Sequence, residues 1–323
     1  MPIAVIAFDF DPLLRLAEGL VVRWQTVALA AVIATALVIA GLIARRDGLR
    51  PDDLLFIAIG TVPGAVIGGR IGYVLLHLPY YQADPGAIVD PSLGAMELAL
   101  GVVGGLLTGS AVAALLGAPV GRWRHALVLP LLFVLGVGKL TMILGGAGQG
   151  TPSVSSWATA FLGPGPWGSL APALPSVPSQ AIEGAVTLAI LLIVTAGLWL
   201  GAFSTRDGRA LFAGIAIWAF ARAVVASTWR DDVVIAGLDM GSVIAIAVGL
   251  GAVAVLIVMT VRERRRGSDP AVVSDPAVAS SPAASTAATA GAGPTAAPGS
   301  SPLPADPSRD IPTWPDPGSR PRF

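Results

Sequence analysis

The stretch "PGAVIGGRIGYVLLHLP", residues 63–79, decides the fold class. Together with the apolar residues before it, it forms a run long enough for a helix that crosses a bilayer, which takes roughly 20 residues. Arg70 lies inside this run, well away from either end. A charge at the centre of a membrane helix costs roughly 2.5–3.5 kcal/mol on insertion scales. We therefore expect Arg70 to face a partner, a ligand or water.

The composition places the whole chain in the same class. Its 323 residues are 54% hydrophobic and only 12% charged, whereas about a quarter of the residues in a soluble domain are charged. The formal net charge is zero, so we expect no nucleic-acid partner. The chain has no cysteine, which excludes disulfides, cysteine metal sites and a cysteine nucleophile in this chain. We expect no cleaved signal peptide, no metal and no cofactor.

Hydropathy windows predict seven helical spans, and hence an all-α polytopic membrane protein. The spans cover roughly 20–44, 53–78, 95–117, 126–147, 181–202, 209–229 and 239–261. Arginine clusters follow the first, third, fifth and seventh spans: Arg45, Arg46 and Arg50; Arg122 and Arg124; Arg206 and Arg209; Arg262, Arg264, Arg265 and Arg266. Seven spans place all of them on one side, which the positive-inside bias assigns to the cytoplasm. This predicts an outside N-terminus and a cytoplasmic C-terminus.

The chain divides into a membrane domain, residues 1–266, and a tail, residues 267–323. The tail is rich in alanine, proline and serine, and it has too little apolar bulk to form a core. We expect it to be disordered in the cytoplasm.

Three basic residues lie inside predicted spans at similar depth: Arg70, Lys139 and Arg222. Two carboxylates, Glu97 and Glu183, lie early in other spans and are candidate partners. One explanation is a set of internal salt bridges. The other is a pocket for a phosphate-bearing lipid headgroup, because arginine's planar fork binds pairs of phosphate oxygens. The sequence leaves both explanations open.

Six features follow one another along the chain: "GGRIGYVL" (68–75), "GAMELALGVVGG" (94–105), "GKLTMILGGAGQG" (138–150), "PSQAIE" (178–183), Arg222 and "MGSVIAI" (240–246). In this order they resemble the prolipoprotein diacylglyceryl transferase family. The resemblance implies transfer of diacylglycerol from phosphatidylglycerol to the lipobox cysteine of prolipoproteins at the bacterial inner membrane. Its expected partners are phosphatidylglycerol, the prolipoprotein signal peptide and membrane lipid. It also implies supporting roles for Glu97, Gln180, Glu183, Gly138 and Gly150.

The chain departs from the family pattern at positions where the family carries proton-transfer and hydrogen-bonding groups. The residues found there are Gln25, Ala99, Lys139, Met142, Ala147, Val177 and Ala226. In the family reaction a thiolate attacks the lipid glycerol carbon and glycerol phosphate leaves. The resemblance implies that Arg70, Lys139 and Arg222 bind the phosphate, with Arg222 as the catalytic candidate. His77, at the outer end of the second span, is a second candidate, for accepting the thiol proton.

Three functions therefore stay open at this point. The chain is an active transferase, a catalytically silent relative that binds phospholipid or prolipoprotein, or an anion transporter that uses its buried arginines.

Overall fold

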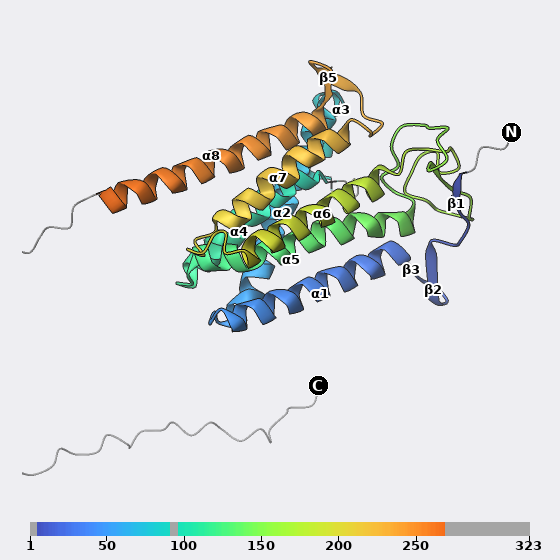
Figure 1. The fold of residues 1–323 in the computed structure, drawn as a ribbon. Helices are drawn as coiled ribbons and strands as arrows, with labels where there is room; N and C mark the ends of the chain where they lie inside the picture. The colour runs from blue at the N-terminus through green and yellow to red at the C-terminus, as the bar shows by residue number, and fades with distance from the viewer. Residues whose placement is uncertain (1–4, 91–95, 269–323) are drawn as a thin grey trace, which may run out of the picture. The chain divides into compact units, whose positions relative to one another are not determined.

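The computed structural model describes residues 5–90 and 96–268. Seven of its helices are long and apolar enough to cross a membrane, which confirms the predicted fold class. They are α1 (Trp24–Arg46), α2 (Pro51–Leu76), α4 (Leu98–Leu115), α5 (Val120–Thr141), α6 (Ser179–Trp199), α7 (Arg209–Ala226) and α8 (Met240–Ser268). Figure 1 shows them as one bundle of roughly parallel and antiparallel helices.

Short elements connect the long helices. The helical ones are α3 (Leu78–Ala83), η1 (Pro85–Val89) and η2 (Met142–Gly145), which continues α5. The strands are β1 (Ile6–Phe8), β2 (Leu13–Ala17), β3 (Leu20–Arg23), β4 (Thr159–Phe161), β5 (Val233–Ile235) and β6 (Leu238–Asp239). They form three two-stranded sheets: β1 pairs with β4 in parallel, and β2–β3 and β5–β6 are antiparallel.

The predicted starts of the fourth and first spans differ from those of the observed helices, and α8 extends to Ser268, beyond the predicted end at 261. The fourth span was expected to begin near residue 126, but α5 begins at Val120 and includes Arg122 and Arg124. Charged residues lower a hydropathy average without preventing a helical backbone, and Pro119 is compatible with a helix start because the first N–H groups have no intrahelical partner. The first helix begins at Trp24, later than expected, because residues 20–23 form β3.

Glycines allow α2 and α4 to pack with their backbones almost in contact. A Cβ added at Gly104 would lie 2.0 Å from the carbonyl oxygen of Gly64, and one at Gly68 would lie 2.2 Å from the carbonyl oxygen of Leu100. Such small residues are what close helix packing in membranes requires. The packing fixes the start of α4, and with it Glu97, against α2.

Helix α7 forms the centre of the bundle. More than half of its membrane window is buried, whereas at least two thirds of the window is not buried in each of the other spans. It packs mainly against α8, with further contacts to α6 and α5. In Figure 1 it lies between α8 and α6. A charged residue on α7, such as Arg222, is therefore surrounded by protein rather than lipid.

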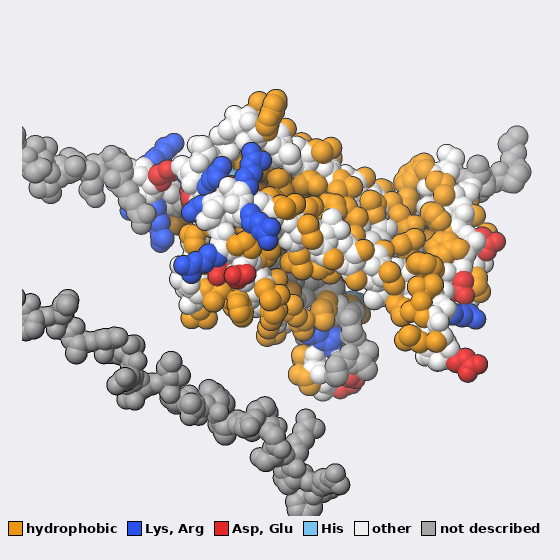
Figure 2. Space-filling model, turned by 90° about the horizontal axis from the view of Figure 1, so that it is seen from below, with side chains coloured by type: hydrophobic (Ala, Val, Ile, Leu, Met, Phe, Trp, Pro, Cys, Tyr) orange, Lys and Arg blue, Asp and Glu red, His pale blue; other side chains and the backbone are white. Residues whose placement is uncertain are grey.

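The two ends of the bundle differ in character. At one end, here called the basic end, Arg122 donates to the carbonyl oxygen of Asp47, and Arg206 forms an ion pair with the Asp47 carboxylate at 2.8 Å. Arginines that are distant in sequence thus meet, as the seven-span prediction requires, and Figure 2 shows arginine side chains gathered there. The other end, here called the loop end, carries the connection 146–178.

The membrane sides of these two ends and the termini stay predictions. The predicted disordered tail lies outside the described residues, apart from residues 267 and 268, which end α8.

Candidate functional site

Arg222 from α7 is buried, with a side-chain exposure of 4%, and contacts two carboxylates. One of its terminal nitrogens, Nη1, donates to Oε1 of Glu183, and Nη2 lies 3.2 Å from Oε1 of Glu97. The third donor, Nε, is buried and has no hydrogen-bond acceptor among the described residues. The guanidinium group therefore joins α4, α6 and α7, and the N–H of its Nε is left for a further acceptor.

Lys139 near the end of α5 joins the same group. Its Nζ lies 2.8 Å from Oε2 of Glu183, so Glu183 bridges both cations. We call Glu97, Lys139, Glu183 and Arg222 the charge cluster. Its two positive and two negative groups cancel. Removing one member of a buried ion pair leaves an uncompensated charge and typically costs about 3–5 kcal/mol.

The start of α4 positions Glu97. As the N-cap residue, its carboxylate accepts hydrogen bonds from the backbone N–H of Ala99 at 2.8 Å and of Leu100 at 2.7 Å. The helix N-terminus also favours a negative charge electrostatically. Gly72 on α2 leaves room for it, because a Cβ there would lie 2.6 Å from the Cβ of Glu97. The motif "GGRIGYVL" thus contributes space to the site through Gly72.

Trp229, just after α7, covers both cations. Its ring centroid lies 4.5 Å from Cζ of Arg222 and 5.3 Å from Nζ of Lys139. Cation–π contacts of this kind contribute about 0.5–2 kcal/mol, depending on desolvation. Gly241 at the start of α8 makes room for the indole, since a Cβ there would lie 3.1 Å from it. Sequence reasoning did not identify Trp229; its position two helical turns beyond Arg222 was the available signal.

Gln180 lies one turn before Glu183 on α6 and is almost fully buried. Neither its side-chain oxygen nor its nitrogen has a hydrogen-bond partner among the described residues. An unsatisfied buried polar group costs about 1–3 kcal/mol, so such an amide beside the charge cluster calls for a further polar partner.

The two glycines expected to support the site differ in how tightly they are held. Gly150 is enclosed, because a Cβ would lie 2.1 Å from Oγ of Ser179 and 2.2 Å from the carbonyl oxygen of Thr228. At Gly138 a Cβ would be only 3.5 Å from a methyl of Leu29, an ordinary contact. Only Gly150 is therefore required by the packing.

Arg70 makes its contacts in a different segment. Its Nη2 donates to the carbonyl oxygen of Ala87 at 2.6 Å, and its Nε donates to that of Ile88 at 2.8 Å. Its Cζ lies 5.4 Å from the centroid of the Tyr81 ring. Arg70 thus holds the connection after α2 in place, which identifies a partner for the charge inside the apolar run. The contacts above bring Lys139 and Arg222 together, whereas the Arg70 contacts just described are with Tyr81, Ala87 and Ile88.

His77 ends α2 at the loop end and is exposed. Its ring centroid lies 4.2 Å from that of Tyr73, and Nδ1 is 3.1 Å from the Tyr73 carbonyl oxygen. Asp231, in the connection between α7 and α8, is close enough to interact electrostatically with both His77 and Arg222. Desolvation by its neighbours raises the pKa of Asp231, and the Asp239 carboxylate raises it further, although Asp231 stays more than a third exposed.

Of the positions that depart from the family pattern, Lys139 belongs to the charge cluster, whereas Gln25, Ala99, Met142, Ala147 and Ala226 are filled by packing contacts. Ala99 and Ala226 are fully buried. Gln25 extends from α1 to Gly145, where a Cβ would lie 2.0 Å from its Oε1. Met142 packs near Gly148, where a Cβ would lie 3.0 Å from its terminal methyl. A Cβ at Gly168 would lie 2.8 Å from that of Ala147, so this position too is closely packed.

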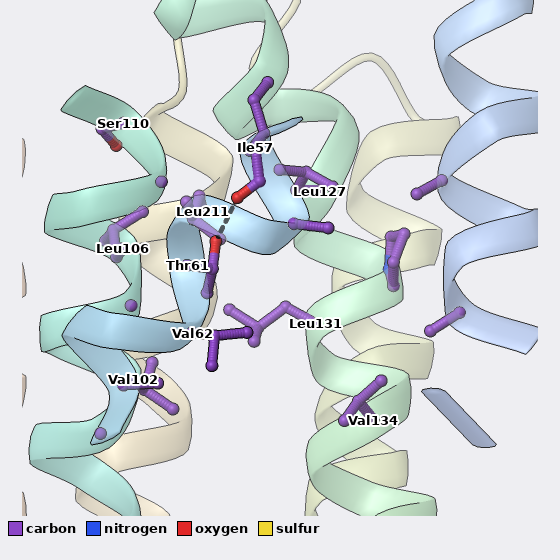
Figure 3. A pocket seen from close by; sticks show the side chains of 18 of the residues that line it. Ile57, Thr61, Val62, Val102, Leu106, Ser110, Leu127, Leu131, Val134 and Leu211 are labelled. Carbon is purple, nitrogen blue, oxygen red and sulfur yellow. Dashed lines mark hydrogen bonds between the residues drawn. The ribbon is translucent and has the colours of Figure 1, made fainter. Parts of the chain in front are cut away.

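An apolar groove of about 580 Å³ begins at the charge cluster. Glu97 lines one end of it, and Trp123 and Arg124 line the other, near the basic end. Between these ends the walls are mainly aliphatic residues and glycines of α1, α2, α4 and α5, with Thr61 and Ser110 as polar members and Leu211 from α7. Figure 3 shows Val62 and Leu131 pointing toward one another across it. Hydropathy does not reveal such a groove, because apolar residues facing a groove and apolar residues facing lipid look alike in sequence.

Comparison with known proteins gives a consistent family. Residues 12–258, from β2 into α8, match the family described as prolipoprotein diacylglyceryl transferase. Relatives from several bacteria bear the name phosphatidylglycerol–prolipoprotein diacylglyceryl transferase. The protein from Paramagnetospirillum magneticum is 30% identical over 210 residues, which cover 62% of this chain and 73% of the relative. Those from Clostridioides difficile and Gluconacetobacter diazotrophicus are 22% and 26% identical, covering 73% and 82% of this chain and 90% and 95% of the relatives.

Proposed function

Because this chain belongs to the prolipoprotein diacylglyceryl transferase family, we propose that it transfers the diacylglyceryl group of phosphatidylglycerol to the lipobox cysteine of prolipoproteins. The site is the charge cluster with Trp229 and Gln180, and the membrane is the bacterial inner membrane. The observation that carries the proposal is that Lys139 and Arg222, from different helices, meet at the Glu183 carboxylate, and that Arg222 also contacts Glu97, which lines an apolar groove. A phospholipid needs this combination of cations and apolar surface.

The phosphate binds where donors remain available. The buried Nε of Arg222 has no acceptor among the described residues. Charge-assisted hydrogen bonds between guanidinium groups and phosphate are among the stronger protein hydrogen bonds. Lys139 provides a second, point-like cation. The amide of Gln180, one turn from Glu183, is available to a glycerol hydroxyl of the headgroup.

In the reaction one proton is transferred, one carbon–sulfur bond forms and one carbon–oxygen bond breaks. The cysteine thiol of the prolipoprotein loses its proton, and the thiolate attacks the glycerol carbon attached to the phosphate oxygen. The carbon–oxygen bond breaks, and glycerol phosphate leaves with the electron pair. Lys139 and Arg222 stabilise the negative charge that develops on the leaving phosphate. His77, with Asp231 near it, is the candidate acceptor for the thiol proton.

Genetic complementation tests the proposal. A bacterium depleted of its own transferase receives this chain, the Arg222→Gln variant, or the Arg209→Gln variant. Arg209 pairs with Asp207 and Glu263 at the basic end, so its loss is a matched removal of one paired arginine outside the site. We expect the chain and Arg209→Gln to restore lipid modification of a reporter prolipoprotein, and Arg222→Gln to fail although it inserts.

The outcomes separate the functions that the sequence left open. Failure of the unchanged chain to restore modification, combined with selective retention of phosphatidylglycerol, identifies a silent lipid-binding relative. Failure combined with anion flux in liposomes identifies a transporter. Either result overturns the proposal. Equal rescue by Arg222→Gln and by the unchanged chain overturns the assignment of the site.

A further inference from the structure

We propose that the apolar groove holds one acyl chain of the lipid whose phosphate binds at the charge cluster, and that its depth admits long and short chains alike. The inference rests on the proposed function and adds the site of an acyl chain to it. Glu97 provides the connection, because its carboxylate contacts Arg222 while the residue also lines the groove. A headgroup at the cluster therefore has an apolar path leading directly from it.

The size of the groove selects a single chain as its occupant. Along α4 the lining runs from Glu97 to Ala113, about 24 Å at the helical rise per residue. A volume of about 580 Å³ over that length gives a mean cross-section of about 24 Å². A long, narrow groove of this kind accommodates one extended hydrocarbon chain. The second chain of a diacyl lipid stays in the bilayer.

The depth of the groove can be compared with the length of a lipid chain. Half the hydrocarbon core of a bilayer is about 15 Å, which corresponds to about ten residues of α4. A chain that starts at Glu97 thus ends near Leu107. Gly64 of α2 packs against Gly104 and Thr108, so Val62 lies close to this depth. Below it the groove continues to Ile57 and Trp123, which gives room for longer chains.

An obstruction at that depth tests the inference. Val62 and Leu131 face each other across the groove (Figure 3), and Val62→Phe places a ring between them. The full-length protein in mixed micelles is exchanged with phosphatidylglycerols of increasing chain length, and the retained lipids are measured by mass spectrometry. We expect the unchanged protein to retain long and short chains alike. Val62→Phe should retain long chains at least about fivefold less well than short ones, the lower end of overpacking costs.

Ile59→Phe is the matched control, because Ile59 is exposed on the same helix and does not line the groove. The inference is overturned if Val62→Phe and Ile59→Phe retain the same distribution of chain lengths while phosphatidylglycerol is still preferred. If Val62→Phe does not accumulate in membranes, Leu131→Phe applies the same obstruction from the opposite wall.

A second series, with the same chains on phosphatidylcholine, separates this inference from the proposed function. We expect phosphatidylcholine of every chain length to be retained less than phosphatidylglycerol. No headgroup preference contradicts the proposed function. Equal chain-length selection with both headgroups shows that the groove holds any bilayer lipid, and this overturns the link between groove and cluster.

Discussion

Glu183 holds the charge cluster together, since it alone contacts both Lys139 and Arg222 among the ion pairs of the described residues. Glu183→Gln keeps the shape of the side chain but leaves the cations uncompensated. We expect it to lower the free energy of unfolding by about 3–5 kcal/mol, measured as a fall in thermal midpoint in detergent. Thr195→Val, a substitution on the same helix at an exposed residue, should change the thermal midpoint little.

A double variant tests whether the effect comes from the ion pair. Adding Lys139→Met to Glu183→Gln removes the stranded lysine charge, so part of the stability should return. If the double variant loses the sum of the two single losses, the ion pair between Lys139 and Glu183 contributes no coupling.

The raised pKa of Asp231 predicts that the stability of the protein depends on pH. This raised pKa means that, above the ordinary value of 3.8, the folded protein holds the proton more tightly than the unfolded chain does. This stabilisation is fully present below pH 3.8 and is lost as the pH rises through the folded pKa. Asp231→Asn should therefore gain thermal stability relative to the unchanged protein at neutral pH and lose that advantage at low pH.

The neighbours of Asp231 define the control for this experiment. Asp239 and Asp232 raise the pKa of the Asp231 carboxyl, whereas His77 and Arg222 lower it. Asp232→Asn removes a carboxylate next in the chain, and it should not reproduce the change with pH. The same pH profile for both variants would assign the effect to the charge of the loop as a whole.

At the residue scale the sequence indicated which carboxylates pair with the buried cations, but it did not indicate where the Arg70 side chain makes its contacts. Glu97 and Glu183 stand out as partners for buried cations because few carboxylates lie within the spans, and the structure contains those ion pairs. The contacts of Arg70 could not be foreseen in the same way. They depend on η1 folding back to present its carbonyl groups, and no periodicity encodes that arrangement.

At the element scale the packing of α2 against α4 decides where Glu97 lies. Gly104→Ala would place a Cβ 2.0 Å from the carbonyl oxygen of Gly64, so the helices must separate. We expect a loss of about 1–3 kcal/mol in unfolding free energy. Gly251→Ala on α8 has nothing within 4 Å of its added Cβ and should be neutral or stabilising by up to about 1 kcal/mol. Equal thermal midpoints for the two variants would show that α2 and α4 tolerate separation.

The long helices are easier to predict from the sequence than the contacts between them. Apolar length identifies a span, and the seven long helices agree with that signal. It does not say which helices touch, because lipid and protein surroundings both accept apolar residues. The strands β1 to β6 escaped prediction for a different reason: each is too short to show a periodic pattern.

At the scale of the whole molecule, orientation is the remaining prediction. The basic end gathers arginines from separate connections, and the positive-inside bias places such an end in the cytoplasm. Because the chain has no cysteine, single cysteines report location without interference. Ser156 lies in the connection 146–178 and Ser204 in the connection between α6 and α7, and both are exposed.

In intact spheroplasts an impermeant thiol reagent should label Ser156→Cys and leave Ser204→Cys unlabelled until the membrane is permeabilised. Permeabilised samples in which both sites react control for accessibility. The reverse pattern would place the loop end in the cytoplasm. Trp229 and Arg230 belong to the loop end, where Arg230 donates to the carbonyl oxygen of Gly150 at 2.6 Å. A reversed orientation would therefore open the charge cluster to the wrong leaflet for an exported prolipoprotein, and the proposed reaction would be excluded.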